Sequence, residues 1–351
     1  MPAAAHQQED LQAEVRHAEE AGLVYVSDAG PGLSRRRRGK GYSYHDADGT
    51  LIRCDDTRAR IDALAIPPAY REVWICPLPH GHLQATGRDE KGRKQYRYHE
   101  KWHDVRQRAK YDRMIAFGEA LPRLRERVEA DLRRQGLPKE KVVALCVRLL
   151  DETLVRIGNA DYARQHRHYG LTTLRDKHAK VKGGAVTFAF VGKSGQEQEV
   201  TLQDRRLARL VKRCRDVPGY SLFQYHDDAG ERCTVDSAAV NAYLREHTGE
   251  DATAKFFRTW GGTVLAAQAL EREGAPESDA DQQRKEAAAV RAVCEALGNT
   301  PAVCRGHYVH PDVFDAYRDG TLARRLSVRH AGNTPAGLDP AEAAVLDLLK
   351  G

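Results

Sequence analysis

The chain has 351 residues, more than one hydrophobic core usually holds, and this length predicts two domains. A net charge of +6 with 30% charged residues favours a polyanionic partner such as nucleic acid, although a merely soluble basic protein would show the same balance. No apolar run reaches the roughly 18 residues of a membrane span, and the polar start, residues 1–12, carries no secretion signal. A cytoplasmic location is therefore expected.

The first hundred residues show the alternation and turns of a small, mainly β domain. A short polar helix is expected at residues 8–21. Strands are expected at residues 23–26, 42–45, 50–54, 72–76, 83–88 and 94–99. The second and third of these strands flank a turn at 46–49 and the last two flank a polar turn, so each pair predicts a hairpin. The basic run at 35–40 is expected to be a flexible loop, either solvated or against a nucleic-acid backbone.

After His103 the apolar pattern takes the helical period, beginning with a stripe at 121–132. Further helices are expected at residues 138–157, 204–215, 235–247, 251–272 and 280–297, with short ones beginning at Thr300, Pro311 and Asp339. One hairpin, 186–191 with 198–202, interrupts the helices, and the segment after Gly320 either packs or stays loose. The predicted fold class is α+β. A small mainly β domain is expected at 1–103, and a mainly α-helical domain carrying a small β-hairpin or sheet at 104–351.

Motifs for bound nucleotides and metals are incomplete. The Gly-Lys-Ser at 192–194 looks like the end of a P-loop, but Thr187 stands where the first glycine is required and a strand pattern follows. The Asp-x-Asp pairs at 46–48 and 279–281 do not complete a calcium loop. The seven scattered cysteines form no CxxC pair, and no HExxH occurs. No cofactor and no metal is therefore expected.

Cleavage of a phosphodiester by a side-chain hydroxyl requires particular residue types. The transition state gathers negative charge on the non-bridging oxygens, which two forked guanidiniums match. The leaving 5′ oxygen needs a proton, which a lysine can supply where nearby arginines lower its pKa. A tyrosine can be the nucleophile because its phenol is more acidic than an aliphatic alcohol. A chain with this chemistry should therefore carry two Arg, one Lys and one Tyr at the ends of its elements.

Four segments supply these residue types. Arg156 ends a predicted helix, Lys193 stands at a hairpin tip, Lys255 and Arg258 share a helical face, and Tyr308 follows a capped turn. Each has an ordinary structural alternative: a charge that complements a helix dipole, a solvated turn lysine, or a surface ion-pair helix. The capped turn alone is not informative, because its GNTP tetrapeptide at 298–301 recurs at 332–335 with Glu, not Tyr, nine residues after the Asn. The information lies in the combination.

In order and spacing, these segments resemble the type IB DNA topoisomerases of the poxvirus and bacterial kind. The matching segments are LVRIGN (154–159), TFAFVGKSG (187–195), KFFRTWGG (255–262), GNTPAVCRGHY (298–308) and, in the first domain, GRKQYRYH (92–99). The resemblance covers residues 20–320. It implies an enzyme that relaxes supercoiled duplex DNA by transient single-strand cleavage and religation, without metal or ATP. It also implies a nucleoid-associated monomer whose two lobes clamp around the duplex.

The resemblance also implies a role for individual residues. Arg156 and Arg258 would bind the scissile phosphate, Lys193 would protonate the 5′ oxygen, and Tyr308 would form the 3′-phosphotyrosyl link. Asn299 stands where the poxvirus enzymes have a His, as in bacterial relatives, and can donate the same hydrogen bond without carrying charge. Contacts to DNA are implied for Gln95, Tyr96, Tyr98, Tyr162 and Lys255.

Two other functions stay open at this point. A tyrosine recombinase would share the catalytic logic, but it would have a helical N-terminal clamp and usually a His-x-x-Arg box, whereas here the first domain has a β pattern and Lys255 precedes Arg258. A non-catalytic DNA-binding protein could keep the same scaffold, but here all four charged or nucleophilic positions are filled. No residue in the sequence fixes a preferred cleavage sequence, a cellular role or a protein partner.

Overall fold

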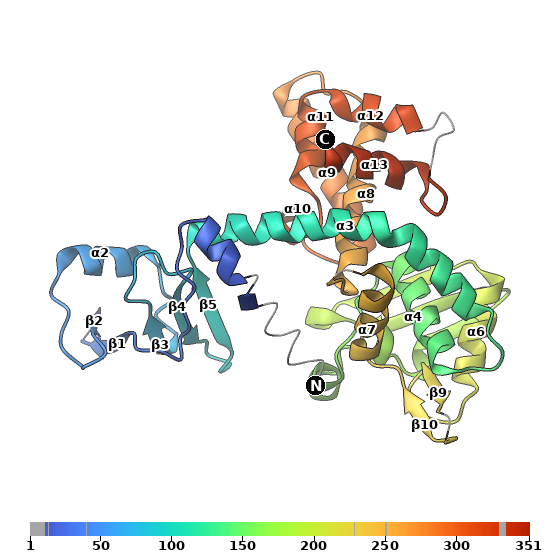
Figure 1. Ribbon diagram of the computed structural model, residues 1–351, viewed down its shortest axis with the longest axis horizontal. Helices are drawn as coiled ribbons and strands as arrows, with labels where there is room; N and C mark the ends of the chain where they lie inside the picture. Colours follow the sequence, from blue (N-terminus) through green and yellow to red (C-terminus); the bar gives the residue numbers. More distant parts are fainter. Residues whose placement is uncertain (1–10, 13, 40, 228, 250, 330–334) are drawn as a thin grey trace. The chain divides into compact units, whose positions relative to one another are not determined.

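A computed structural model describes the chain except residues 1–10, 13, 40, 228, 250 and 330–334. The chain divides into two compact units, Met1–Lys110 and Tyr111–Gly351 (Figure 1). A small antiparallel sheet dominates the first unit, and helices with two small sheets form the second. The predicted α+β class is therefore confirmed. The predicted domain boundary after residue 103 stays a prediction, and the two units divide within helix α3 (Glu100–Leu132).

The first unit is built on a five-stranded antiparallel sheet with the strand order β2-β1-β3-β4-β5. Its strands are β1 (Leu33–Arg38), β2 (Gly41–His45), β3 (Arg71–Ile75), β4 (Leu83–Arg88) and β5 (Lys94–Tyr98). Helix α2 (Asp55–Ala63) places Ile61 against Leu33, Ile75 and Ala85, which are cross-strand neighbours in β1, β3 and β4. The sheet is therefore buried on one face by a short helix.

Several predictions for this unit are confirmed. The hairpin of 83–88 with 94–99 is the pair β4 and β5, and the strand expected at 72–76 is β3. The polar helix expected at 8–21 is present at residues 11–12 and 14–20, with the rest of its first half outside the described residues. Residues 50–54, in contrast, were predicted as a strand but form only a bridge at Leu51, and helix α2, which was not predicted, begins directly after them.

Three predictions for this unit are wrong. Residues 23–26 form no strand, because Val24 makes only an isolated bridge to Gly81. Residues 35–38 of the basic run belong to strand β1 rather than to a flexible loop, residue 39 is in the turn that follows, and residue 40 lies outside the described residues. Strand β2 pairs with β1 and not with residues 50–54, where a single bridge from His45 to Leu51 remains. The guanidinium of Arg35 explains the difference: it donates hydrogen bonds to the carbonyl oxygens of residues 66, 67 and 70 and so fixes β1 in the sheet.

The second unit is mainly helical. Its helices, after the shared α3, are α4 (Lys139–Thr153), α5 (Ala160–His166), α6 (Arg205–Arg215), α7 (Ser237–Thr248), α8 (Lys255–Glu273), α9 (Asp279–Leu297), α10 (Pro301–His307), α11 (Pro311–Arg318), α12 (Thr321–Arg329) and α13 (Pro340–Lys350). Short 3-10 turns are η1 (Leu171–Thr173), η2 (Asp176–His178) and η3 (Lys193–Gly195). One sheet has the order β6-β7-β8 (Ala179–Lys182, Ala185–Val191, Glu197–Leu202), and β9 (Gln224–His226) pairs with β10 (Arg232–Thr234).

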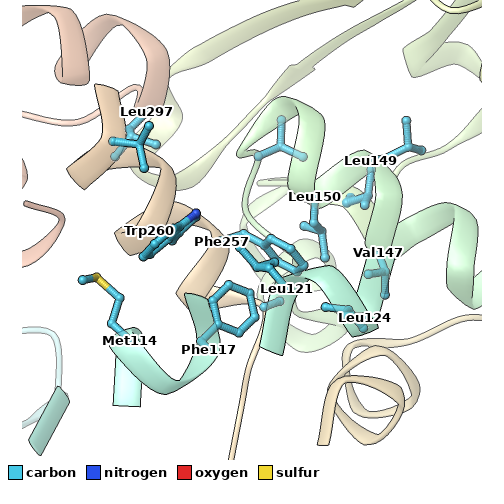
Figure 2. Packing of buried hydrophobic residues seen from close by; sticks show 14 of the residues in the cluster. Met114, Phe117, Leu121, Leu124, Val147, Leu149, Leu150, Phe257, Trp260 and Leu297 are labelled. Carbon is cyan, nitrogen blue, oxygen red and sulfur yellow. The ribbon is translucent and has the colours of Figure 1, made fainter. Parts of the chain in front are cut away.

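The core of this unit joins α3, α4 and α8. Figure 2 shows Phe117 of α3 among Phe257 and Trp260 of α8, and the ring centroids of Phe117 and Phe257 lie 5.0 Å apart in an edge-to-face arrangement. The predicted apolar stripe at 121–132 faces this core. Because aromatic side chains bury large areas and lock each other's rotamers, the first turns of α8 are held firmly, and they carry Arg258.

The helices and the hairpin expected in this unit are confirmed, with additions and one correction. The hairpin is β7 with β8, and β6, which was not predicted, adds a third strand. The helix expected to reach residue 157 ends at Thr153, because Leu154 takes a left-handed conformation (φ 53°) and closes it. The segment after Gly320 contains α12 and α13, which pack on each other and on α8. The second GNTP tetrapeptide has its first three residues, 332–334, outside the described residues.

Candidate active site

One cavity of about 620 Å³ gathers most of the predicted site residues. Its lining consists of Arg156, Ile157, Gly158, Asn159, Tyr162, His168, Tyr169, Lys193, Ala254, Lys255, Arg258 and Tyr308. The segments that meet here are far apart in sequence: the end of α4, the tip of the β7–β8 hairpin, the start of α8 and the end of α10. Asn299 does not line the cavity but is bonded to Arg156, which does.

Arg156 lies in the extended segment that follows α4, and backbone hydrogen bonds join this segment to the start of η1. The amide of Leu171 donates to the carbonyl oxygen of Arg156 at 2.8 Å, and the amide of Thr172 donates to that of Ile157 at 2.7 Å. Residue 170 must be glycine, because a Cβ there would lie 2.6 Å from the Arg156 oxygen. The backbone of Arg156 is therefore fixed, and its guanidinium Nη2 donates to Oδ1 of Asn299.

Arg258 is an unusually buried charge, with 4% of its surface exposed. Its Nη1 donates to the carbonyl oxygen of Leu154, and its Nη2 donates to that of Leu297 at 2.8 Å. Its Nε is buried and has no hydrogen-bond partner among the described residues. Burial, and then the neighbouring positive charge of Arg156, lower the pKa of Arg258. The hydrogen bonds of Nη1 and Nη2 go to carbonyl oxygens and not to a carboxylate, so this buried cation is suited to receive an anion.

Tyr308 ends α10, and its main chain lies directly against α8. The ideal Cβ position at Gly262 is 2.6 Å from the carbonyl oxygen of Tyr308, so only glycine allows this approach. Thr263 adds a long hydrogen bond of 3.5 Å from its hydroxyl to the same oxygen. This close backbone approach fixes the Cα of the predicted nucleophile.

The phenol ring of Tyr308 lies beside the buried cation: Cζ of Arg258 is 5.0 Å from the ring centroid. Burial alone would raise the pKa of Tyr308, but the positive charges of Arg258, Arg156 and Lys255 outweigh it and hold the pKa below its ordinary value of 10.0. A nearby cation favours the charged phenolate in this way. The site therefore eases removal of the phenolic proton.

Asn299 follows the left-handed Gly298 that ends α9. Its Oδ1 accepts from Arg156, which fixes the orientation of the amide, and its Nδ2 is buried without a partner in the described part of the chain. An unsatisfied buried donor of this kind costs about 1–3 kcal/mol. The cost would be removed if an oxygen of a bound ligand accepted the hydrogen bond.

Lys193 and Lys255 complete the positive lining. Lys193 is exposed at the tip of the hairpin, where the amide of Gly192 donates to the oxygen of Gln196 at 2.7 Å and closes the turn. Lys255 is the exposed first residue of α8. Neither has a salt bridge to an acidic residue of the described chain. The surface-ion-pair alternative for residues 255 and 258 is therefore not what the structure has.

The predicted DNA contacts fall into two groups. Tyr162 on α5 is 44% exposed and lines the cavity. In the first unit, Tyr96 and Tyr98 stack with ring centroids 6.0 Å apart, because alternate residues of β5 point to one face. Gln95 points to the other face, where its Nε2 donates to Asp89 at 3.0 Å. The structure thus brings the two tyrosines together but not Gln95.

The cavity residues that were not predicted as site residues include His168 and Tyr169. They follow α5 in the run His166-Arg167-His168-Tyr169, and an alternation of basic and aromatic residues is a signal that could have pointed to them. Within the described ranges, no three His, Cys, Asp or Glu side chains gather into a metal-binding group. None of the helices described is long and apolar enough to cross a bilayer.

Family models and related sequences agree on one family. The family model for the catalytic core of eukaryotic DNA topoisomerase I matches residues 99–327, and the model for the N-terminal domain of bacterial DNA topoisomerase IB matches residues 41–89. DNA topoisomerase 1B of Acanthamoeba polyphaga mimivirus is 31% identical over 311 residues, 87% of this chain and 92% of that protein. DNA topoisomerase I of monkeypox virus is 19% identical over 252 residues, 71% of this chain and 76% of that protein.

Among solved structures, the XerH site-specific recombinase bound to its difH substrate aligns with a TM-score of 0.36 and 17% identity, over 55% of this chain and 49% of that one. A likeness this low does not establish a shared fold. The catalytic-core family model, in contrast, matches more than half of the chain, and the alignment with the mimivirus relative covers most of both proteins. The chain therefore belongs to the type IB DNA topoisomerases and is a type I DNA topoisomerase.

Proposed function

We propose that this cavity cuts and reseals one strand of duplex DNA with Tyr308 as the nucleophile, and thereby relaxes supercoils. The observation that carries the proposal is the phenol of Tyr308 beside the buried guanidinium of Arg258, 5.0 Å from Cζ to ring centroid, in a cavity that Arg156 and Lys193 also line. A phenol with a lowered pKa among fixed cations suits attack on a phosphate.

In the proposed cleavage step, the phenol of Tyr308 gives its proton to water and its oxygen bonds to the scissile phosphorus. The bond from phosphorus to the 5′ oxygen breaks, and Lys193 gives a proton to that oxygen. The 3′ end is now held as a phosphotyrosine while the free 5′ end rotates. In religation the 5′ hydroxyl returns its proton to Lys193 and attacks phosphorus, and Tyr308 leaves and regains a proton. One phosphodiester replaces another, so no ATP is consumed.

Three side chains would stabilise the charge that develops on the non-bridging oxygens: Arg156, Arg258 and Asn299. Arg156 and Arg258 supply guanidiniums, and two buried donors have no partner among the described residues: Nε of the Arg258 guanidinium and Nδ2 of Asn299. A bound phosphate would satisfy these donors, and preorganised donors of this kind lower a barrier by about 3–4 kcal/mol each. Asn299 would donate to one oxygen while Arg156 holds its amide in place.

Contacts to DNA extend this proposal beyond the cavity. Tyr162 and Lys255 would contact the strand near the cut, and Gln95, Tyr96 and Tyr98 would contact the duplex from the first unit. Lys94 and Arg106 lie over the rings of Tyr96 and Tyr98, at 5.5 and 5.8 Å, and mixed basic and aromatic surfaces suit sugar and phosphate. The protein would act as a monomer on DNA in the cytoplasm, with residues 1–103 as a DNA-binding domain.

The test is relaxation of a supercoiled plasmid in EDTA without ATP. Wild-type protein should relax the plasmid, and Tyr308→Phe should bind DNA but form no covalent adduct with a labelled duplex. Tyr220→Phe is the matched control, because Tyr220 is 86% exposed on a loop and does not line the cavity. Folded wild-type protein that leaves the plasmid supercoiled would refute the proposal, and an adduct that persists in Tyr308→Phe would move the nucleophile to another tyrosine.

A further inference from the structure

His168 lines the cavity but has no part in the proposed chemistry. It lies between α5 and η1, two residues before Gly170, whose lack of a side chain allows the close approach to Arg156. Its own backbone is held on both sides: Arg167 closes α5 in a left-handed conformation, and the amide of Tyr169 donates to the carbonyl oxygen of Val191 at 2.8 Å. The imidazole is therefore presented from a fixed position next to the strand that leads to Lys193.

The two ring nitrogens of His168 have different surroundings. Nδ1 is buried and has no hydrogen-bond partner among the described residues. Nε2 faces the hairpin tip and lies 3.8 Å from the ideal Cβ position of Gly195. A buried N–H without an acceptor costs about 1–3 kcal/mol, more than a bare acceptor nitrogen. The tautomer with its proton on Nε2 is therefore favoured, and it presents an N–H donor beside Lys193.

The neighbours of His168 suit an anion and not a metal. Its ring centroid lies 5.9 Å from that of Tyr162 and 6.1 Å from that of His166, and the lining beyond these rings is cationic. Among the described residues, no acidic side chain lines the cavity. A donor held among cations and aromatic rings binds a phosphate oxygen well, because charge-assisted hydrogen bonds are about twice as strong as neutral ones.

We propose that His168 is a DNA-binding residue that donates a hydrogen bond from Nε2 to a non-bridging oxygen of a phosphate next to the scissile one, on the Lys193 side of the cavity. The inference rests on the proposed function, since it requires DNA in this cavity. His168 would thus hold the strand in register between Tyr162 and Lys193 without touching the reacting phosphorus.

The test couples a protein change to a DNA change. Each phosphate that flanks the cleavage site is replaced in turn by an uncharged methylphosphonate, and the rate of adduct formation is measured in a single turnover. With unmodified DNA, His168→Ala should lower the rate roughly 10- to 100-fold, the range for a hydrogen bond to a charged group. At the phosphate that His168 contacts, the methylphosphonate should slow adduct formation by wild-type protein by a similar factor, but it should not slow His168→Ala any further. At the other positions, the effect of the methylphosphonate and the effect of the substitution should multiply.

Two more variants make the result specific. His168→Gln keeps an N–H donor and should recover part of the rate, and it also serves if His168→Ala fails to fold. His166→Ala removes a ring of the same cluster that does not line the cavity, and it should keep the methylphosphonate effect at every position. Wild-type protein that forms no adduct overturns the proposed function and this inference together. The inference alone is overturned if wild-type protein cleaves but, at every phosphate position, the effect of the methylphosphonate multiplies with the effect of His168→Ala or His168→Gln.

Discussion

The substitution Gly262→Ala should move the backbone of the proposed nucleophile, Tyr308, without changing its side chain or the charged residues around it. The new methyl would lie 2.6 Å from the carbonyl oxygen of Tyr308 and 3.3 Å from Cδ1 of Leu297. Ordinary contact begins near 3.4 Å, so the backbone of Tyr308 must retreat by most of an ångström. A displacement of that size in a reacting group costs about 100-fold in rate. Alanine adds about 1 kcal/mol of helix stability, and overpacking removes about 1–3 kcal/mol, so the protein should still fold.

The assay is single-turnover adduct formation on a labelled duplex, with the melting temperature measured on the same preparation. Gly306→Ala is the matched control, because it adds the same methyl two residues before Tyr308, where the added Cβ meets no atom within 4 Å. The control should keep the wild-type rate and melt at the same or a higher temperature. A wild-type rate in Gly262→Ala would refute the reasoning, as would an equal loss in both variants.

Other predictions concern charge and hydrogen bonding. Because the pKa of Tyr308 is lowered, a spectrophotometric titration of wild-type protein should show a first phase of phenol ionisation below pH 10. This phase should be missing in Tyr308→Phe, and an unchanged first phase would contradict the lowered pKa. Burial alone would raise the pKa of Glu342, but the hydrogen bonds and charge of Arg125 outweigh burial and lower the pKa. The carboxylate of Glu342 therefore stabilises the folded protein above its unfolded pKa of about 4.3, and this stabilisation is lost as the pH falls through the folded pKa. Glu342→Gln should therefore cost roughly 1–3 kcal/mol in denaturant melts at pH 7 and progressively less below pH 4, and a constant difference would argue against this linkage. Asn299→His should keep most adduct formation and Asn299→Ala should not, and equal rates would remove Asn299 from the phosphate site.

Local patterns predicted the fold where the contacts are local. The β7–β8 hairpin and the stripe at 121–132 follow from periods of two and of three to four residues, and both are found. Strand β1 was missed because its stability depends on Arg35 reaching carbonyl groups about thirty residues away. Helix α4 stops at Thr153 although the apolar pattern continues, because Leu154 is left-handed and the backbone of residues 156 and 157 is bonded to residues 171 and 172 instead. Long-range bonds of this kind leave no periodic signal.

The site was predictable as a set of residue types and not as geometry. Arg156, Lys193, Arg258 and Tyr308 share a cavity, and chemistry together with spacing had singled them out. Nothing in the sequence indicated that Arg258 is buried or that Asn299 is bonded to Arg156. The three candidates on β5 were treated as a group, but strand alternation places Gln95 on the face opposite Tyr96 and Tyr98.

The hydrogen bonds of Arg258 have a consequence for how the protein matures. They join α8 to carbonyl groups 104 residues earlier and 39 residues later in the chain. Bonds across such separations form late, after the local helices and hairpins, because the intervening loops must close first. A partly folded molecule therefore has its tyrosine but not the arginine beside it. If Arg258 and Tyr308 act together as proposed, a molecule in which these bonds have not yet formed would lack the cleavage activity.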